Sequence, residues 1–117
     1  MFLNVKRGPG NTSKNEELIA AIGRRFRTQH WPVGHPVPEV YFDPRSLALD
    51  PADKAVSHAK CVVIDGSIAF VSSANFTEAA QIRNIEIGVL IRSRPVSERL
   101  VNFFFTMITG GVLKRAL

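Results

Sequence analysis

The fold is organised around residues 58–66, HAKCVVIDG, which continue through residues 67–75 as SIAFVSSAN. Two short apolar runs flank Asp65-Gly66, the dipeptide most typical of a tight turn between two paired strands. Side chains alternate between the two faces of a strand, so His58 and Lys60 share one face with the even-numbered valine and isoleucine that follow. The sequence therefore predicts a β-hairpin that carries an imidazole and an ammonium group side by side.

A second polar pair, Ser73 and Asn75, lies near the end of the returning run, beside the start of the first. We therefore expect four polar side chains to converge at one end of the hairpin. Lys60 and Asn75 carry donors that suit the non-bridging oxygens of a phosphate. His58 can act as a nucleophile or a general acid–base. No carboxylate pair or His/Cys/Asp cluster in the sequence is placed to hold a metal, so we expect phosphate chemistry without one.

This pattern resembles the signature of the phospholipase D superfamily, HxKxxxxD followed by GSxN. The matching positions are His58, Lys60, Asp65, Ser73 and Asn75, with Ser72 where the family more often has glycine. Asn84-Ile85-Glu86 falls where the family often carries a downstream N-x-E. The phosphodiesterase motif is placed at residues 53–80, and residues 1–117 are expected to form a phospholipase D-like half-domain.

The resemblance implies a two-step phosphoryl transfer that needs no metal and no cofactor. His58 would attack phosphorus and form a phosphohistidine, while a second histidine would protonate the leaving alcohol and then activate water or an acceptor alcohol. Lys60 and Asn75 would hold the phosphoryl oxygens and Ser73 would assist. Asp65 is explained by its place in the turn and has a structural role in this interpretation.

Glu86 is the one charge in a predicted strand at residues 85–91. A carboxylate buried among isoleucine and valine needs a partner, and a catalytic imidazole that it would orient is the natural one. The alternative is a glutamate on an edge strand that faces water. With the family pattern in view, we expect the catalytic role.

The superfamily builds one active site from two motifs, and this sequence has only one, because neither His30 nor His35 lies in a similar pattern. Two interpretations follow. The chain forms a homodimer in which His58 of each copy meets at the interface, or it is the C-terminal half of a longer two-motif protein. The few residues before the motif slightly favour the second interpretation, with a truncated N-terminus.

Periodicity and turn residues predict the order strand, helix, strand, hairpin, strand, helix, an α/β fold with a mixed sheet and helices packed on it. The strands outside the hairpin are expected at residues 2–5, 39–42 and 85–91, and residues 76–80 as a short turn or helical segment. Ser13 and Glu16 form a capping-box pattern before the first helix. The last helix is expected at residues 95–109, with an apolar stripe made by Val96, Leu100, Phe103, Phe104 and Met107.

Charge and composition bear on partners and location. The chain has 15 Lys and Arg against 10 Asp and Glu, a net charge of +5. Residues 1–30 hold six Lys or Arg against two Glu, which favours nucleic acid or an anionic lipid surface as a partner, or else marks a solvated helix face. Cys61 is the only cysteine, which suits a reducing cytosol. No apolar run approaches the roughly 20 residues that span a bilayer, so we expect a cytoplasmic protein without a transmembrane segment.

The leading hypothesis is a hydrolase that cleaves a phosphodiester, with nucleic acid favoured over phospholipid, and hence a possible nuclease. The alternative is a non-catalytic nucleic-acid-binding or assembly module, or the inactive half of a two-motif enzyme. The run SANxTExA…NxExGV and the Leu/Phe-rich last helix resemble the phospholipase D-like component of bacterial DISARM systems, which implies a role in anti-phage defence.

Overall fold

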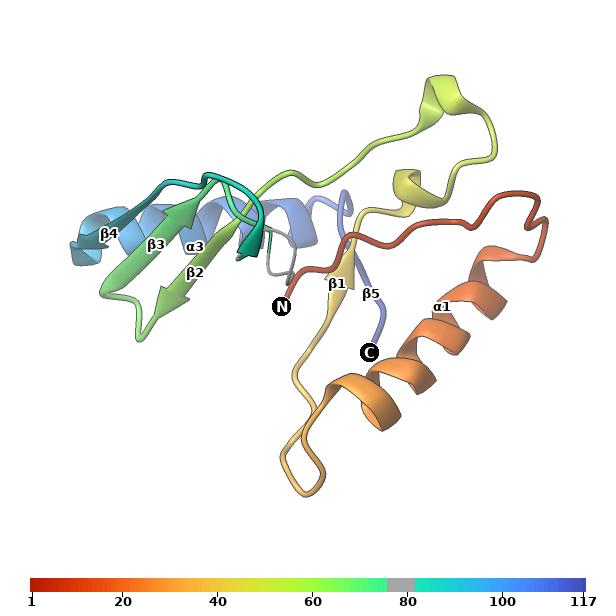
Figure 1. The fold of residues 1–117 in the computed structure, drawn as a ribbon, viewed down its shortest axis with the longest axis horizontal. Coiled ribbons are helices and arrows are strands. Elements are labelled where there is room, and N and C mark those ends of the chain that lie inside the picture. The colour runs from red at the N-terminus through yellow and green to blue at the C-terminus, as the bar shows by residue number, and fades with distance from the viewer. Residues whose placement is uncertain (76–81) are drawn as a thin grey trace. The chain divides into compact units, whose positions relative to one another are not determined.

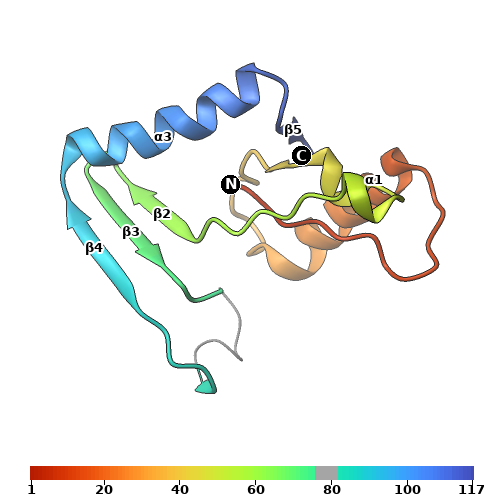
Figure 2. The ribbon, with the colours of Figure 1, turned by 90° about the horizontal axis from the view of Figure 1, so that it is seen from above.

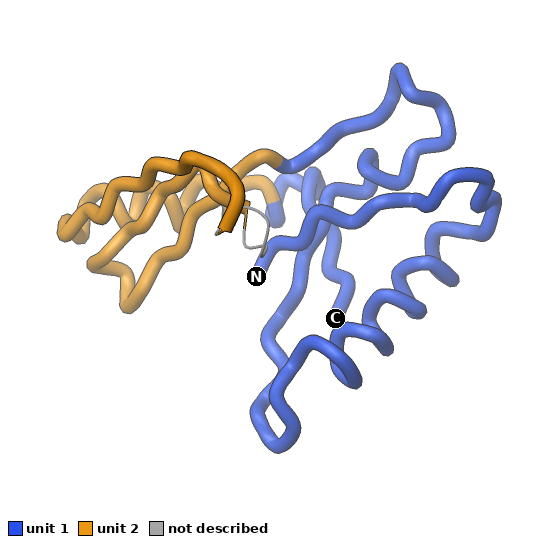
Figure 3. Tube along the Cα trace, viewed as in Figure 1, with its two compact units in different colours: residues 1–57, 108–117 blue, residues 58–107 orange. Residues whose placement is uncertain are grey.

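The computed structural model describes residues 1–75 and 82–117 (Figure 1). They divide into two compact units, residues 1–57 with 108–117 and residues 58–107 (Figure 3). The expected α/β composition is confirmed, and the predicted turn or helical segment at residues 76–80 lies outside the described residues. The helices are α1 (Asn15–Arg25), which continues as a π-helical turn (Phe26–His30), and α3 (Arg94–Thr109), with 3-10 turns at Pro44–Leu47 and Pro51–Asp53. The strands are β1 (Tyr41–Phe42), β2 (Cys61–Ile64), β3 (Ile68–Ser72), β4 (Gly88–Arg92) and β5 (Lys114–Arg115).

The first unit joins α1 to a small antiparallel sheet in which β1 pairs with β5. The predicted strand at residues 2–5 is reduced to a single parallel bridge between Phe2 and Tyr41. A core cluster of the unit contains Val5, Phe42 and Leu47, against which Leu18, Ile19 and Ile22 of α1 pack.

The predicted capping box at the start of α1 is wrong. The helix begins at Asn15, and its N-cap is Lys14, whose side chain makes no capping hydrogen bond. Ser13 belongs to the preceding turn: its backbone N–H donates to Asn11 Oδ1 at 2.8 Å, and its carbonyl accepts from Arg7 Nη1 at 2.7 Å. These bonds hold Ser13 outside the helix, a competition between local side-chain bonding and capping that is common for short polar residues.

The second unit contains a three-stranded antiparallel sheet in the order β2-β3-β4, followed by α3 (Figure 2). The predicted hairpin is confirmed, with Ile64 paired to Ile68 across the turn. Asp65 and Gly66 have φ values of 49° and 60°, the left-handed region that favours these two residue types. Ser67 also lies in the turn and donates its N–H to Ile64 O at 3.1 Å, so the strands are separated by three residues instead of two.

The two faces of the hairpin differ in burial. Cys61 and Val63 on β2 are half-buried, whereas Val62 and Ile64 on the opposite face are 39% and 48% exposed. Ala69 on β3 is fully buried. The expected alternation is therefore present, but the face shared with Lys60 is more open than a core face.

The stripe predicted for the last helix is correct only in part. Leu100, Phe104 and Met107 are half-buried, but Val96 and Phe103 are exposed, and the fully buried residue of α3 is Ser97. Ser97, Leu100 and Phe104 follow the spacing of one helical face, so the buried face is rotated toward a small polar residue.

Gly88 on β4 permits close packing against β3. A Cβ at this position would lie 2.7 Å from Cε2 of Phe70 and 3.3 Å from the carbonyl oxygen of Val71. We expect Gly88→Ala to displace the Phe70 ring and to lower the free energy of unfolding by about 1–3 kcal/mol, measured by denaturant unfolding. Gly8→Ala is the matched control, since a Cβ there would meet nothing within 4 Å. Equal stability of the two variants would contradict this account of the packing.

Candidate functional site

The backbone register brings the predicted site residues to one end of the three-stranded sheet. The carbonyl of Lys60, one residue before β2, accepts the N–H of Ser72 at 2.9 Å, which extends the hairpin ladder beyond the strand. His58 precedes Lys60 by two positions, and Ser73 and Asn75 follow the end of β3. Figure 2 shows β3 leaving the sheet at the end where β2 enters it.

Ser73 and Glu86 form the centre of a hydrogen-bonded cluster at this end. The Ser73 hydroxyl donates to Glu86 Oε2 at 2.5 Å and accepts the backbone N–H of Ile87 at 3.1 Å. Asn84 Nδ2 donates to the other carboxylate oxygen, Glu86 Oε1, at 3.1 Å. Both oxygens of Glu86 therefore have a donor, and its carboxylate is held in one orientation.

The contact between Ser73 and Glu86 depends on a break in the strand. Regular alternation along β3 would place Ser73 on the face opposite Lys60 and Glu86. The strand ends at Ser72, however, and the chain bends at Ser73. The bend allows the Ser73 hydroxyl to reach a carboxylate that the pleat alone would have kept on the other side.

The pKa of Glu86 is lowered, first by the hydrogen bond from Ser73, then by the one from Asn84 and by the nearby charge of Lys60, while partial desolvation opposes the shift. Glu86 is half-exposed, and its neighbours Ile85 and Ile87 are exposed, so the expectation of a carboxylate buried among apolar residues is wrong. The reason is that Glu86 precedes β4, an edge strand of the sheet.

Ser73→Ala is expected to raise the pKa of Glu86 toward the usual value for a glutamate, because it removes the largest contribution to the shift. A carboxylate whose pKa is lower in the folded state than in the unfolded state stabilises the fold at pH values above its unfolded-state pKa. This stabilisation is lost as the pH falls through the folded-state pKa. Wild type should therefore retain an ionised Glu86 to lower pH than the variant does. NMR titration of the Glu86 carboxyl measures this, with Ser67→Ala in the hairpin turn as the control. An unchanged pKa in Ser73→Ala would show that the hydroxyl contributes nothing.

His58, Lys60 and Asn75 present their functional groups differently. Lys60 Nζ donates to the backbone carbonyl of His58 at 2.9 Å, which places the ammonium group beside the histidine. His58 and Asn75 are exposed, and within residues 1–75 and 82–117 neither side chain has a hydrogen-bond partner. An accessible imidazole, an ammonium group and an amide thus accompany the ionised Glu86 at this end of the sheet. Such a set can contact the oxygens of a phosphate and offer a nitrogen nucleophile.

Other sequence predictions fall elsewhere. Asp65 lies in the hairpin turn, separated from Lys60 by the whole of β2. Asn84 was not predicted to act in the site, and its spacing of two positions from Glu86 was the available signal. Among the described residues, no three His, Cys, Asp or Glu side chains gather closely enough to hold a metal ion.

Comparison with protein families found one that covers this region. The family described as "Cardiolipin synthase, PLD-like domain" matches residues 37–108, more than half of the chain, and the matched range contains every predicted site residue. The chain belongs to this phospholipase D-like domain family. The superfamily resemblance is thereby confirmed, and it relates the chain to phosphodiesterases. No curated protein and no solved structure matches the chain. The resemblance to the DISARM component stays a prediction.

In the described part of the chain, no helix combines the length and the apolar character that crossing a bilayer requires.

Proposed function

We propose that the chain is a metal-independent phosphodiesterase of the phospholipase D type, with His58 as its nucleophile. The observation that carries the proposal is the gathering of His58, Lys60 and the Ser73–Glu86 pair at one end of a single sheet, within the range that matches the family. Family membership alone supports only the broader class. The exposed side chain of His58, a residue whose backbone carbonyl accepts from Lys60 Nζ, supports the specific chemistry.

In the first step, an imidazole nitrogen of His58 attacks phosphorus, a P–N bond forms and the bond to the leaving oxygen breaks. A second imidazole supplies the proton that the leaving alcohol takes up. In the second step this imidazole removes a proton from water, whose oxygen attacks phosphorus and breaks the P–N bond. Lys60 and Asn75 hold the non-bridging oxygens, where their donors offset the charge that develops.

Glu86 would orient an imidazole, and Ser73 would position Glu86. The lowered pKa of Glu86 supports this role, because an ionised carboxylate stabilises an imidazolium in a defined tautomer. Its two donors within the described residues, Ser73 and Asn84, leave lone pairs available for a further partner.

The second imidazole must come from outside this motif. We propose that it is His58 of a second copy or the equivalent residue of another half of a longer protein. Mass measurement in solution separates these sources, since only a self-associating chain completes the site by itself. The basic first 30 residues suit the anionic backbone of nucleic acid, which we propose as the substrate in preference to a phospholipid. Cytoplasmic location and anti-phage defence stay predictions.

The test is hydrolysis of bis(p-nitrophenyl) phosphate in excess EDTA, with the mass of the protein determined in the same buffer. Turnover by a dimer supports a self-contained, metal-independent site. A folded dimer without turnover on this substrate or on an oligonucleotide would contradict the proposal. That outcome favours the second candidate, a non-catalytic nucleic-acid-binding or assembly module, which the single motif and the basic first 30 residues support.

A further inference from the structure

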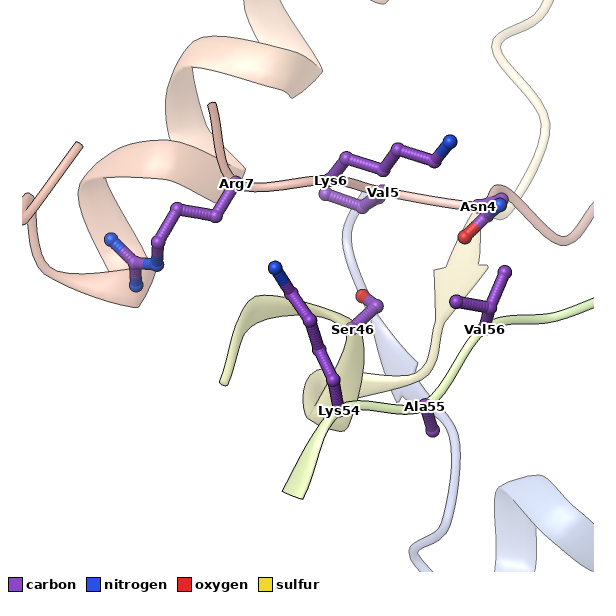
Figure 4. A pocket seen from close by; sticks show the side chains of 8 residues that line it. All are labelled: Asn4, Val5, Lys6, Arg7, Ser46, Lys54, Ala55 and Val56. Carbon is purple, nitrogen blue, oxygen red and sulfur yellow. The ribbon is translucent and has the colours of Figure 1, made fainter. Parts of the chain in front are cut away.

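The first unit contains a small pocket whose cations do not converge on a common ligand. It has a volume of about 160 Å³ and is lined by Asn4, Val5, Lys6, Arg7, Ser46, Lys54, Ala55 and Val56 (Figure 4). Four of the five N–H donors of Arg7 are bonded to Leu47 O, Asn11 O, Ser13 O and Asn15 Oδ1. The Lys6 ammonium points away from the pocket (Figure 4). More exposed cations of this unit lie at the end of α1, next to the loop at residues 31–38.

This loop holds an apolar side chain outward at its tip. Val33 is 97% exposed, and Val37 is exposed as well. The tip is a tight turn in which the N–H of His35 donates to Pro32 O at 3.4 Å, and Gly34 has a φ of 83°, as a type II turn requires at its third position. Asn, Asp, Ser, Gly and Pro dominate such turns. A valine at the tip is therefore unexpected on a surface that meets only water.

Two contacts of Trp31 hold the loop against the end of α1. Its Nε1 donates to Pro36 O at 3.0 Å, which closes the loop at its base. Its ring stacks on that of Phe26, with centroids 5.6 Å apart and planes inclined at 24°, and Phe26 is buried. Figure 1 shows the loop, between α1 and β1, at one extremity of this unit. Val33 is thus presented on a protrusion that is already ordered, which reduces the entropy cost of binding.

Positive charge accompanies the apolar tip. Arg25 and Arg27 are the sequence neighbours of Phe26, so the ring contact of Phe26 with Trp31 places them near the base of the loop, with Arg24 one position earlier. All three arginines are exposed, and within residues 1–75 and 82–117 none of them forms an ion pair with a carboxylate. Residues 18–38 contain no Asp or Glu. The end of α1 and the loop therefore combine uncompensated cations with an exposed valine.

We propose that this loop docks the chain on an anionic lipid surface. Val33 inserts among the lipids, and the arginines contact the phosphates of the headgroups. Trp31 suits the boundary between the two, because its ring is apolar and its N–H has a partner.

Other partners of this loop account for fewer of its features. A nucleic acid would engage the arginines but would leave Val33 without an apolar partner. A stable protein interface buries about 800 Å² on each side, more than the tip of one loop provides. A bilayer accepts a small apolar protrusion without a matching cavity. The inference concerns where the chain is held, and it leaves the substrate of the proposed function unchanged.

The sole tryptophan makes the test specific to the loop, because Trp31 is the only one in the chain. Vesicles contain equal parts of phosphatidylglycerol and phosphatidylcholine, and the phosphatidylcholine carries brominated acyl chains that quench an inserted indole. All proteins carry His58→Ala, so binding is measured without turnover and its outcome is separate from that of the proposed function. We expect Trp31 to be quenched by these vesicles and not by brominated phosphatidylcholine alone. Absence of binding, or binding without quenching of Trp31, would overturn the proposal.

Two pairs of variants test the apolar and the charged part of the loop. Val33→Ser is expected to weaken partitioning into anionic vesicles about tenfold, whereas Leu49→Ser, at another exposed apolar residue of this unit, should change it little. Arg27→Gln is expected to weaken it about fivefold, whereas Lys14→Gln, at the opposite end of α1, should not. Circular dichroism establishes that each variant is folded. Equal losses within either pair would overturn the proposal in favour of diffuse attraction to the vesicle.

A further arm separates lipid from nucleic acid. The affinity of the same variants for a fluorescent single-stranded oligonucleotide is measured by anisotropy. Val33→Ser should leave this affinity unchanged, since an oligonucleotide offers the valine no apolar surface comparable with a bilayer. If Arg27→Gln weakened oligonucleotide binding and left vesicle binding intact, the arginines would belong to a nucleic acid contact and the lipid assignment would be overturned.

Discussion

His58→Ala is expected to lower kcat for phosphodiester hydrolysis in excess EDTA by at least about 10⁴-fold, the scale on which removal of a catalytic nucleophile acts. The reason is that, among the described residues at this end of the sheet, the other amine and hydroxyl groups are engaged in hydrogen bonds: Lys60 donates to a backbone carbonyl, Ser73 donates to Glu86, and Ser72 donates to Ile87 O. The measurement is steady-state turnover of bis(p-nitrophenyl) phosphate by wild type and variant at equal protein concentration.

His35→Ala is the matched control for this substitution, because it removes an exposed histidine that lies outside the motif. It should leave kcat unchanged. His58 is exposed as well, so its replacement should not unfold the chain, and equal denaturant midpoints for the two variants would establish that activity is lost without loss of structure. Activity that persists in His58→Ala would refute the histidine mechanism.

Lys60→Gln is expected to reduce kcat by about 10²–10³-fold, the cost of removing one positioned donor to charge that develops in a transition state. The ammonium group lies beside His58, where it can contact the oxygens of a phosphate under attack. A second readout follows from the structure: the charge of Lys60 helps to lower the pKa of Glu86, so this pKa should rise in the variant.

Arg99→Gln is the control for Lys60→Gln, since it also removes one exposed positive charge, from α3 in the same unit. It should alter neither kcat nor the pKa of Glu86. If Lys60→Gln raised the pKa of Glu86 but left kcat intact, Lys60 would be an electrostatic neighbour of the carboxylate without a part in the chemistry.

Local patterns in the sequence were sufficient for much of the second unit. The alternation of β2, the turn at Asp65-Gly66 and the third strand are confirmed, because each depends on residues close together in the chain. The same holds for the two helices. The register of the hairpin was not determined in this way, because the turn has three residues instead of the expected two, and this length places Lys60 opposite Ser72 at the end of β3.

Local patterns failed where other contacts compete for a backbone or side-chain group. Ser13 resembles a helix cap, yet its backbone groups are bonded to the side chains of Asn11 and Arg7, and the helix starts at Asn15. In α3 an apolar stripe that included Val96 and Phe103 was expected, but the buried face is centred on Ser97. Burial is decided by what packs against an element, which periodicity alone does not specify.

The sequence by itself determines the residue types of the site, their spacing and the hairpin that aligns them, because the periodicity of a strand and the preferences of turn residues act over only a few residues. The bend after β3 and the hydrogen bond between Ser73 and Glu86 arise only when two separate segments of the chain fold together. These contacts form because hydrogen bonds and burial in three dimensions outweigh the regular alternation of a strand and the preferences of single residues.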